Sequence, residues 1–365
     1  MNKNKHQIWD WPLFITTCLL ITIGTVMLFS TSPVVGYSTY NDSYFFIKRF
    51  FIFFLIGIPL FIAGYLIPYK HYQKFAFSGL LFSILLLLLT FAPSIGRKIG
   101  GASRWINLYF FQLQPVEICK FFITVFLAAA FANKKKQIQS FFKGILPLLL
   151  IISIPILLLG LQPDLGNIVV ILIVTFSLLF LSKAKIKHLL IFAFIGISLI
   201  SINIFMHPYQ ITRIQSFLTP WADPLGKNYH TVQSFTAIGS GGILGNGLGQ
   251  SKLKYFYLPL HYSDFIYAII CEEGGFILAS IILFLFTFLF FRGLKIALFA
   301  KNTFAYFLAL GLSLFLVVQA FINIGVVIGV LPTTGIPLTF ISYGGTSLLT
   351  SIFFISVILN ISKSQ

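Results

Sequence analysis

The sequence is poor in charged side chains, which make up 9% of its 365 residues, whereas hydrophobic residues make up 58%. A soluble globular domain carries about 25% charged residues, so this composition excludes an ordinary water-soluble fold. In hydrocarbon every backbone polar group must be paired within the protein, which leaves helical bundles or closed barrels. The unbroken apolar runs at 80–91 and 168–181 favour helices over alternating barrel strands. The composition therefore predicts an all-α integral membrane protein.

Cysteine and histidine are also scarce, with three and six residues respectively. Cys18, Cys119 and Cys271 each lie in an apolar run and form no CxxC pair, so we expect three buried thiols. The histidines show no HExxH pattern and no ligand spacing, and nothing in the sequence predicts a zinc site.

The hydrophobic pattern predicts a bundle of about ten transmembrane helices within a single membrane domain, residues 1–365. The first apolar run is too long for a signal peptide, so we interpret it as an uncleaved span. A large extracytoplasmic loop, residues 207–262, is expected between helices seven and eight. The predicted helices are 11–31, 46–67, 75–92, 115–132, 145–161, 164–182, 187–206, 263–291, 303–329 and 338–361.

The positive charges orient this bundle. Placing both termini in the cytoplasm puts 15 of the 25 Lys and Arg residues there with one acid, Asp10, as the positive-inside rule expects. These cations would face anionic headgroups, so the net charge of +17 implies no nucleic-acid partner. The other seven acids fall on the outer side or within helix boundaries, and ionisable groups at membrane depth are usually functional.

Three outer segments carry the candidate chemistry. Residues 93–114 contain Arg104 and lead into a helix on which Glu117 and Lys120 share one face, either as a local ion pair or as part of a polar cavity. The loop 207–262 contains a glycine-rich stretch, 239–249, which either cradles a phosphate or is simply flexible. Asp264 follows as a helix cap or a functional carboxylate, and the interrupted segment 331–338 is consistent with a pocket.

Six separated motifs in this order resemble the SEDS family (shape, elongation, division and sporulation), which includes FtsW and RodA. They lie at 101–106, 114–120, 161–166, 233–249, 264–273 and 331–335. The stretches 45–49 and 247–259 are more similar to FtsW than to RodA. The chain departs from the FtsW-like pattern at Leu260, Tyr262 and Ser263, which stand where Glu, His and Thr are usual.

The resemblance implies an inverting peptidoglycan glycosyltransferase that polymerises lipid II at the outer face of the bacterial cytoplasmic membrane, for septal wall synthesis. It implies Asp264 as the general base, or as the carboxylate that holds a divalent cation such as Mg²⁺ or Mn²⁺. The implied partners are lipid II, a class B penicillin-binding transpeptidase and other division-complex membrane proteins. The substrate-binding residues that it implies are Arg104, Lys120, Glu117, Gln233 and Ser234.

Other functions stay open at this point. A lipid II flippase would also need many spans and intramembrane charges, and a RodA-like polymerase would serve elongation instead of division. A non-catalytic scaffold would tolerate substitution at Asp264 and Lys120. The gathering of seven acids on one side favours the enzyme, because a flippase needs polar groups that can be reached from both faces.

Overall fold

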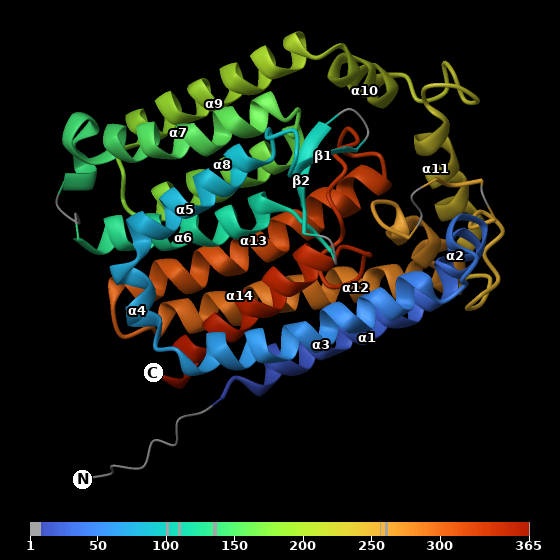
Figure 1. The fold of residues 1–365 in the computed structure, drawn as a ribbon, viewed down its shortest axis with the longest axis horizontal. Coiled ribbons are helices and arrows are strands. Elements are labelled where there is room, and N and C mark those ends of the chain that lie inside the picture. Colours follow the sequence, from blue (N-terminus) through green and yellow to red (C-terminus); the bar gives the residue numbers. More distant parts are fainter. Residues whose placement is uncertain are drawn as a thin grey trace.

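The computed structural model describes residues 9–99, 102–108, 111–133, 137–255, 257–259 and 262–364. Ten helices form the body of this part of the chain (Figure 1). They are α1 (Trp11–Thr31), α3 (Phe45–Leu66), α5 (Ala76–Leu89), α6 (Pro115–Asn133), α7 (Leu146–Leu161), α8 (Leu165–Leu181), α9 (Ile186–Met206), α12 (Ile266–Leu298), α13 (Thr303–Val327) and α14 (Gly345–Lys363).

Shorter elements join these helices. They are α2 (Pro33–Tyr40), α4 (Tyr69–Lys74), the 3₁₀ turn η1 (Gln137–Gln139), the π-helical turn η2 (Phe141–Ile145), α10 (Pro208–Leu218) and α11 (Tyr229–Gly241). Between α5 and α6 the chain forms a small antiparallel sheet of β1 (Gly96–Ile99), β2 (Ala102–Asn107) and β3 (Gln112–Leu113).

The prediction of about ten membrane helices is confirmed. Eight of the described helices have the length and hydropathy of a membrane span, with η2 continuing into α7, and the shorter apolar helices α5 and α8 complete the ten. Helix α13 is the most enclosed, and it packs against α6, α8, α12 and α14. A largely apolar helix belongs in such a central place, whereas α9 exposes most of its surface.

The two ends of the bundle carry different short elements. In Figure 1, helix α4 and the end of α14 lie on the left, whereas α2, α10 and α11 lie on the right. Arg292, near the end of α12, forms an ion pair with Asp10, with Nη2 2.6 Å from Oδ2. Asp10 also caps α1, because its carboxylate accepts a hydrogen bond from the backbone N–H of Leu13.

Two segments whose structure the prediction left open are now described, and two details of the prediction were wrong. The expected loop 207–262 contains the helices α10 and α11, and the segment before α6 forms strands. The last helix begins at Gly345 instead of 338, because residues 338–344 fold irregularly with Phe340 at φ 66°. Cys18 is exposed on α1, since the apolar run around it faces outward, while Cys119 and Cys271 are buried as expected.

Helix α12 is broken at Gly275, whose φ of 63° no helical residue adopts. The glycine-rich stretch after α11 pairs with this break. The backbone N–H groups of Asn246 and Gly247 donate to the carbonyls of Glu272 and Glu273, and that of Phe276 donates to Gly242. These N–H groups therefore satisfy helix carbonyls that the break leaves free, and they are not available to a phosphate.

Candidate functional site

A cavity of about 430 Å³ lies where α10, α11, the start of α12 and the segment after α13 meet. Its wall combines one carboxylate, three basic side chains, hydroxyl groups and backbone. The lining includes Tyr209, Arg213, Lys227, His230, Asp264, Asn323, Thr333 and Gly335. Of these, Asp264 is a candidate from its sequence position, and Thr333 and Gly335 lie in the interrupted segment 331–338 that was expected to be consistent with a pocket.

Asp264 stands just before the first turn of α12 and is partly exposed toward the cavity. The surrounding protein removes water from its carboxylate, which raises its pKa to about 6, although the positive charges of Arg213 and Arg104 oppose this rise. Its backbone is held in place because Asn323 Nδ2 donates to the Asp264 carbonyl at 2.8 Å. A carboxylate held at a pKa near the physiological range is suited to accept a proton.

Basic groups share the cavity with Asp264. Arg213 comes from α10, Lys227 from the following turn and His230 from the first turn of α11. Burial and the charge of Arg213 lower the pKa of His230, whose ring stacks on Phe265 with centroids 6.0 Å apart. At neutral pH the imidazole is therefore uncharged, and Arg213 and Lys227 supply the positive charge of this wall.

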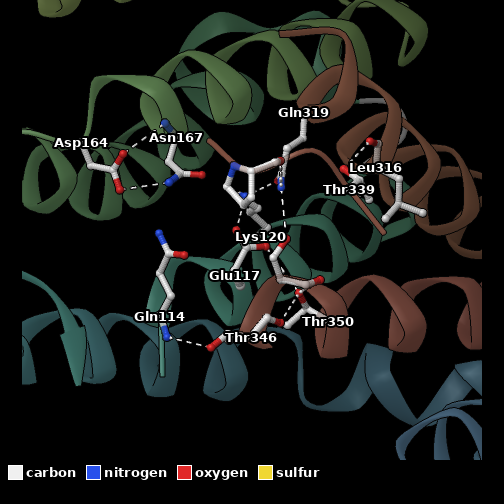
Figure 2. Close-up of polar contacts among 12 residues, drawn as sticks. Gln114, Glu117, Lys120, Asp164, Asn167, Leu316, Gln319, Thr339, Thr346 and Thr350 are labelled. Atoms are coloured by element: carbon white, nitrogen blue, oxygen red, sulfur yellow. Dashed lines mark hydrogen bonds and ion pairs between the residues drawn. The ribbon is translucent and has the colours of Figure 1, made fainter. Parts of the chain in front are cut away.

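Arg104 projects from β2 toward the connection between α7 and α8. Its Nε donates to the carbonyl of Gln162 at 3.3 Å, and its Nη2 donates to that of Pro163. The Nε atom also lies 3.9 Å from Oδ2 of Asp164. Asp164 in turn caps α8 and accepts a hydrogen bond from the Asn167 side chain at 2.9 Å (Figure 2). The N–H groups of Arg104 therefore hold the connection between α7 and α8 in place. Its positive charge also lowers the pKa of Asp264 electrostatically, against the larger rise that burial causes.

Glu117 and Lys120 form a buried ion pair on α6, with Nζ 2.7 Å from Oε1 (Figure 2). Lys120 also donates to Gln319 Oε1 on α13 at 2.6 Å, and Thr350 of α14 donates to Glu117 at 3.4 Å. The pair therefore links three central helices. Lys120 is 1% exposed, and it is not among the side chains that line the cavity described above.

Two polar residues of α13 connect this pair with Asp264. Gln319 and Asn323 stand four residues apart, so they lie on one face of the helix. Gln319 Nε2 donates to the carbonyl of Pro337 at 3.3 Å, and Asn323 Nδ2 donates to that of Ile336 at 2.7 Å. The irregular segment after α13 is thereby fixed against the helix, with its Gly335 facing the cavity.

Gln233 and Ser234 lie on α11, away from the cavity lining described above. The Ser234 hydroxyl donates to the Val327 carbonyl at the end of α13 at 2.8 Å, which anchors α11 to the bundle. Gln233 is half-buried on the same helix. The structure thus places Asp264 and Arg213 in one cavity, and the positive charge of Arg104 also acts on the Asp264 carboxylate. The other predicted site residues do not line this cavity; they are Lys120, Glu117, Gln233 and Ser234.

The acids Glu272 and Glu273 are fully paired. Lys254 donates to Glu273 at 3.0 Å, and the Ser30 hydroxyl donates to the same carboxylate at 2.7 Å. Glu272 accepts from the Ser251 hydroxyl and from the backbone N–H of Lys252. The cluster joins α1, the segment after α11 and the break in α12. These contacts give both adjacent acids the partners that buried carboxylates need.

Of the three positions that depart from the FtsW-like pattern, Leu260 lies outside the described residues. Tyr262 and Ser263 contribute backbone carbonyls: Tyr262 accepts from the N–H of Tyr343 at 3.0 Å, and Ser263 from the Ser342 hydroxyl at 2.6 Å. The Tyr262 ring also packs on Phe46, with centroids 4.5 Å apart. At these two places the chain therefore holds the start of α12 against α3 and the segment before α14.

Within the described ranges, no three His, Cys, Asp or Glu side chains gather as a metal site. Asp264 is the acidic side chain of the cavity lining. A Mg²⁺ ion is often held by one or two protein carboxylates together with substrate phosphates, so a single aspartate fits a cation that arrives with a phosphorylated substrate.

Sequence reasoning missed Asn323 and counted Arg213 and His230 only among scattered charges. A signal for Asn323 existed, because Gln319 and Asn323 are polar residues spaced i,i+4 inside an otherwise apolar helix. No such signal existed for Arg213 and His230, since the approach of α10 and α11 to Asp264 depends on how the segment 207–262 folds.

Comparison with known proteins gives a consistent result along the whole chain. The profile of the FtsW, RodA and SpoVE family, described as a cell cycle protein, matches residues 10–365. Stage V sporulation protein E of Bacillus subtilis is 40% identical over 97% of both chains. The probable peptidoglycan glycosyltransferase FtsW of Buchnera aphidicola from Acyrthosiphon pisum is 41% identical over 98% of this chain and 90% of its own.

Solved structures share the fold. One, described as the structural coordination of polymerization and crosslinking by a peptidoglycan synthase complex, has a TM-score of 0.80 and 27% identity, covering 98% of each chain. The rod shape determining protein RodA of Thermus thermophilus gives a TM-score of 0.71 over 98% of this chain and 97% of its own. Its identity of 24% supports likeness of fold alone.

Proposed function

Because this chain belongs to the FtsW, RodA and SpoVE family of multi-pass membrane proteins, we propose that it is a peptidoglycan glycosyltransferase that polymerises lipid II into glycan strands. It would act at the outer face of the cytoplasmic membrane. Its similarity to proteins named FtsW favours a role in septal wall synthesis, with the protein at the division site.

The observation that carries this proposal is Asp264, a carboxylate with a raised pKa of about 6 in a cavity lined by positive charge. In the reaction, the hydroxyl of one sugar attacks the anomeric carbon of another, and the bond from that carbon to polyprenyl diphosphate breaks. Asp264 accepts the proton of the attacking hydroxyl as the new glycosidic bond forms. A single inverting displacement needs this one base and no second carboxylate as nucleophile.

The other residues support this base. Arg104 places positive charge close enough to stabilise the Asp264 carboxylate and a departing phosphate. Glu117 and Lys120 hold α6 to α13 and α14, and so fix the frame behind the segment that faces Asp264. Ser234 fixes α11, on which Gln233 also stands. Direct contacts of Lys120, Glu117, Gln233 and Ser234 with substrate stay predictions.

A divalent cation, Mg²⁺ or Mn²⁺, is compatible with this site. Asp264 would be its protein ligand, and the substrate diphosphate would supply further oxygens. Such an ion would neutralise charge on the leaving group, and Asp264 would then serve as its ligand instead of as the general base.

We also propose a class B penicillin-binding transpeptidase as the partner, together with other membrane proteins of the division complex. The similar structure that concerns polymerization together with crosslinking supports such an assembly. This chain folds as a membrane bundle, and its large connection 207–262 forms the helices α10 and α11, so we assign crosslinking to the partner.

The test compares the parent with Asp264→Asn in polymerisation of labelled lipid II, each protein purified with its cognate transpeptidase. Removing the base should lower the rate by about a hundredfold to ten-thousandfold. Asp42→Asn is the matched control, because Asp42 pairs with the exposed Lys48 at 2.8 Å outside the cavity. An Asp264→Asn protein that polymerises at the parental rate would refute the assignment.

A further inference from the structure

Two cations of the cavity supply positive charge to its wall but have not yet been assigned a ligand. Arg213 and Lys227 line the same cavity as Asp264, and both belong to the segment between α9 and α12. Lys227 is exposed, and its backbone N–H, not its ammonium, contacts Asp223, at 2.9 Å from Oδ2. Among the described residues, no carboxylate oxygen lies within 4.0 Å of the ammonium of Lys227 or the guanidinium of Arg213.

Three other basic residues near the cavity end of the bundle are already engaged. Arg104 donates to two backbone carbonyls, and Lys120 donates to Glu117 and Gln319. Lys254 uses its ammonium on Ser30, Gly249 and Glu273. Drawing any of these to an anion would break buried contacts, whereas Lys227 can turn toward one freely.

Arg213 is braced so that its guanidinium stays beside the cavity. Its Nη1 donates to the Thr333 carbonyl at 3.0 Å, its Nη2 donates to the Tyr209 hydroxyl at 2.6 Å, and the guanidinium lies 4.5 Å over the Tyr209 ring. Five N–H bonds are available to an arginine, so donors remain for a ligand. A fixed, planar set of donors is what recognition of phosphate requires.

Gly335 marks the point at which the base and this cation meet. A methyl group at its Cα would lie 3.7 Å from Oδ2 of Asp264 and 4.0 Å from Nη2 of Arg213. The absence of a side chain keeps this space open. A ligand placed there can meet the carboxylate on one side and the guanidinium on the other.

We propose that Arg213 and Lys227 form the subsite that binds the diphosphate of the polyprenyl-linked substrate. This inference rests on the proposed function. That function needs positive charge beside the leaving diphosphate, and we assign this charge to Arg213 and Lys227. In the donor substrate the diphosphate is bonded to the anomeric carbon under attack, so base and cations must face one ligand from opposite sides. When that carbon–oxygen bond breaks, the diphosphate keeps the electron pair, and Arg213 and Lys227 neutralise the developing negative charge.

The test measures equilibrium binding of undecaprenyl diphosphate to the purified full-length protein in phosphatidylcholine nanodiscs. Undecaprenyl monophosphate is the comparison ligand, and each is titrated at low and high salt. The variants are Arg213→Ala, Arg213→Lys and Lys227→Ala. Lys48→Ala is the control, because Lys48 is an exposed cation outside the cavity.

We expect Arg213→Ala to weaken diphosphate binding by about tenfold to a hundredfold, as for loss of charge-assisted hydrogen bonds. Lys227→Ala should weaken it less, and Arg213→Lys should fall between Arg213→Ala and the parent. In Arg213→Ala and Lys227→Ala, the preference for diphosphate over monophosphate should decrease, and the salt dependence of diphosphate binding should decrease with it. Lys48→Ala should match the parent.

The inference is overturned if Arg213→Ala and Lys227→Ala bind the diphosphate as the parent does. It is also overturned if both ligands weaken equally in Arg213→Ala while Lys227→Ala is unchanged, because Arg213 would then only brace Tyr209 and Thr333. A parent that binds the diphosphate in this way but forms no glycan strands would instead refute the proposed function alone.

Discussion

At the scale of single residues, the role proposed for Asp264 depends on the solvation of its carboxylate. The carboxylate loses water to the surrounding protein, and this raises its pKa to about 6 against the opposing charges of Arg213 and Arg104. Below that pH the group is protonated and cannot accept a proton. Above it the carboxylate is available as a base.

The rate of lipid II polymerisation should follow this titration. We expect kcat/KM to be level above pH 6 and to fall by about tenfold per unit at lower pH. The measurement is a pH profile of the initial rate, with each sample returned to pH 7.5 to show that the protein stays folded. A profile that stays flat well below the usual aspartate pKa would exclude Asp264 as the base.

Arg213→Lys is a useful companion in the same experiment. It keeps a positive charge near Asp264, so the low-pH limb should stay close to that of the parent. A loss of rate at all pH values without movement of the limb would then indicate a contact with substrate and not an effect on the base.

At the scale of elements, the break in α12 separates its long membrane span from the short first part that begins beside Asp264. Gly275 adopts φ 63°, and the carbonyls freed on its N-terminal side accept hydrogen bonds from Asn246 and Gly247. The same region is also held by side-chain contacts, because the Glu273 carboxylate accepts hydrogen bonds from Ser30 and Lys254. The short first part of α12, which begins beside Asp264, is thus tied to the segment that follows α11.

Gly275→Ala should disrupt this arrangement. Its new methyl group would overlap the backbone at Ile243 and Gly245, and the positive φ by itself costs about 1–3 kcal/mol. We expect a lower thermal unfolding temperature in detergent and a strong loss of polymerisation.

Gly239→Ala on α11 is the control, because an added Cβ there meets nothing within 4 Å. Alanine is a better helix former than glycine, so this variant should be as stable as the parent or slightly more stable. If Gly275→Ala behaved in the same way, the break would have no structural importance.

At the scale of the whole molecule, the cavity and the lysine-rich connections lie at opposite ends of the bundle. Helices α10 and α11, which line the cavity, lie at one end, and helix α4 and the end of α14 lie at the other (Figure 1). The positive-inside rule assigns the second end, with Lys70, Lys74, Lys301 and Lys363, to the cytoplasm.

Cysteine labelling tests this orientation. Leu225→Cys places a thiol at a site that is 88% exposed in the segment between α10 and α11, and Lys301→Cys places one at the opposite end. A membrane-impermeant maleimide should label only Leu225→Cys in intact spheroplasts and both variants after permeabilisation. The parent measures the background of the exposed Cys18, and labelling of Lys301→Cys in intact spheroplasts would reverse the orientation.

The sequence by itself determined the number of membrane helices and most of their bounds, with α1 found at 11–31 as predicted. It could do so because burying an apolar run in lipid is a local property of about 20 residues. It also determined Asp264 as a candidate and the pairing of Glu117 with Lys120, since residues spaced i,i+3 on a helix are neighbours whatever the rest of the chain does.

Only the tertiary structure decided which cations face Asp264. Arg213 and Lys227 come from a segment without long apolar runs, so its helices form against the bundle and no local pattern predicts their place. The same holds for Asn323, whose bonds to the Asp264 and Ile336 carbonyls join parts of the chain far apart in sequence. Long-range contacts of this kind are set by packing, and packing decides where the charges converge.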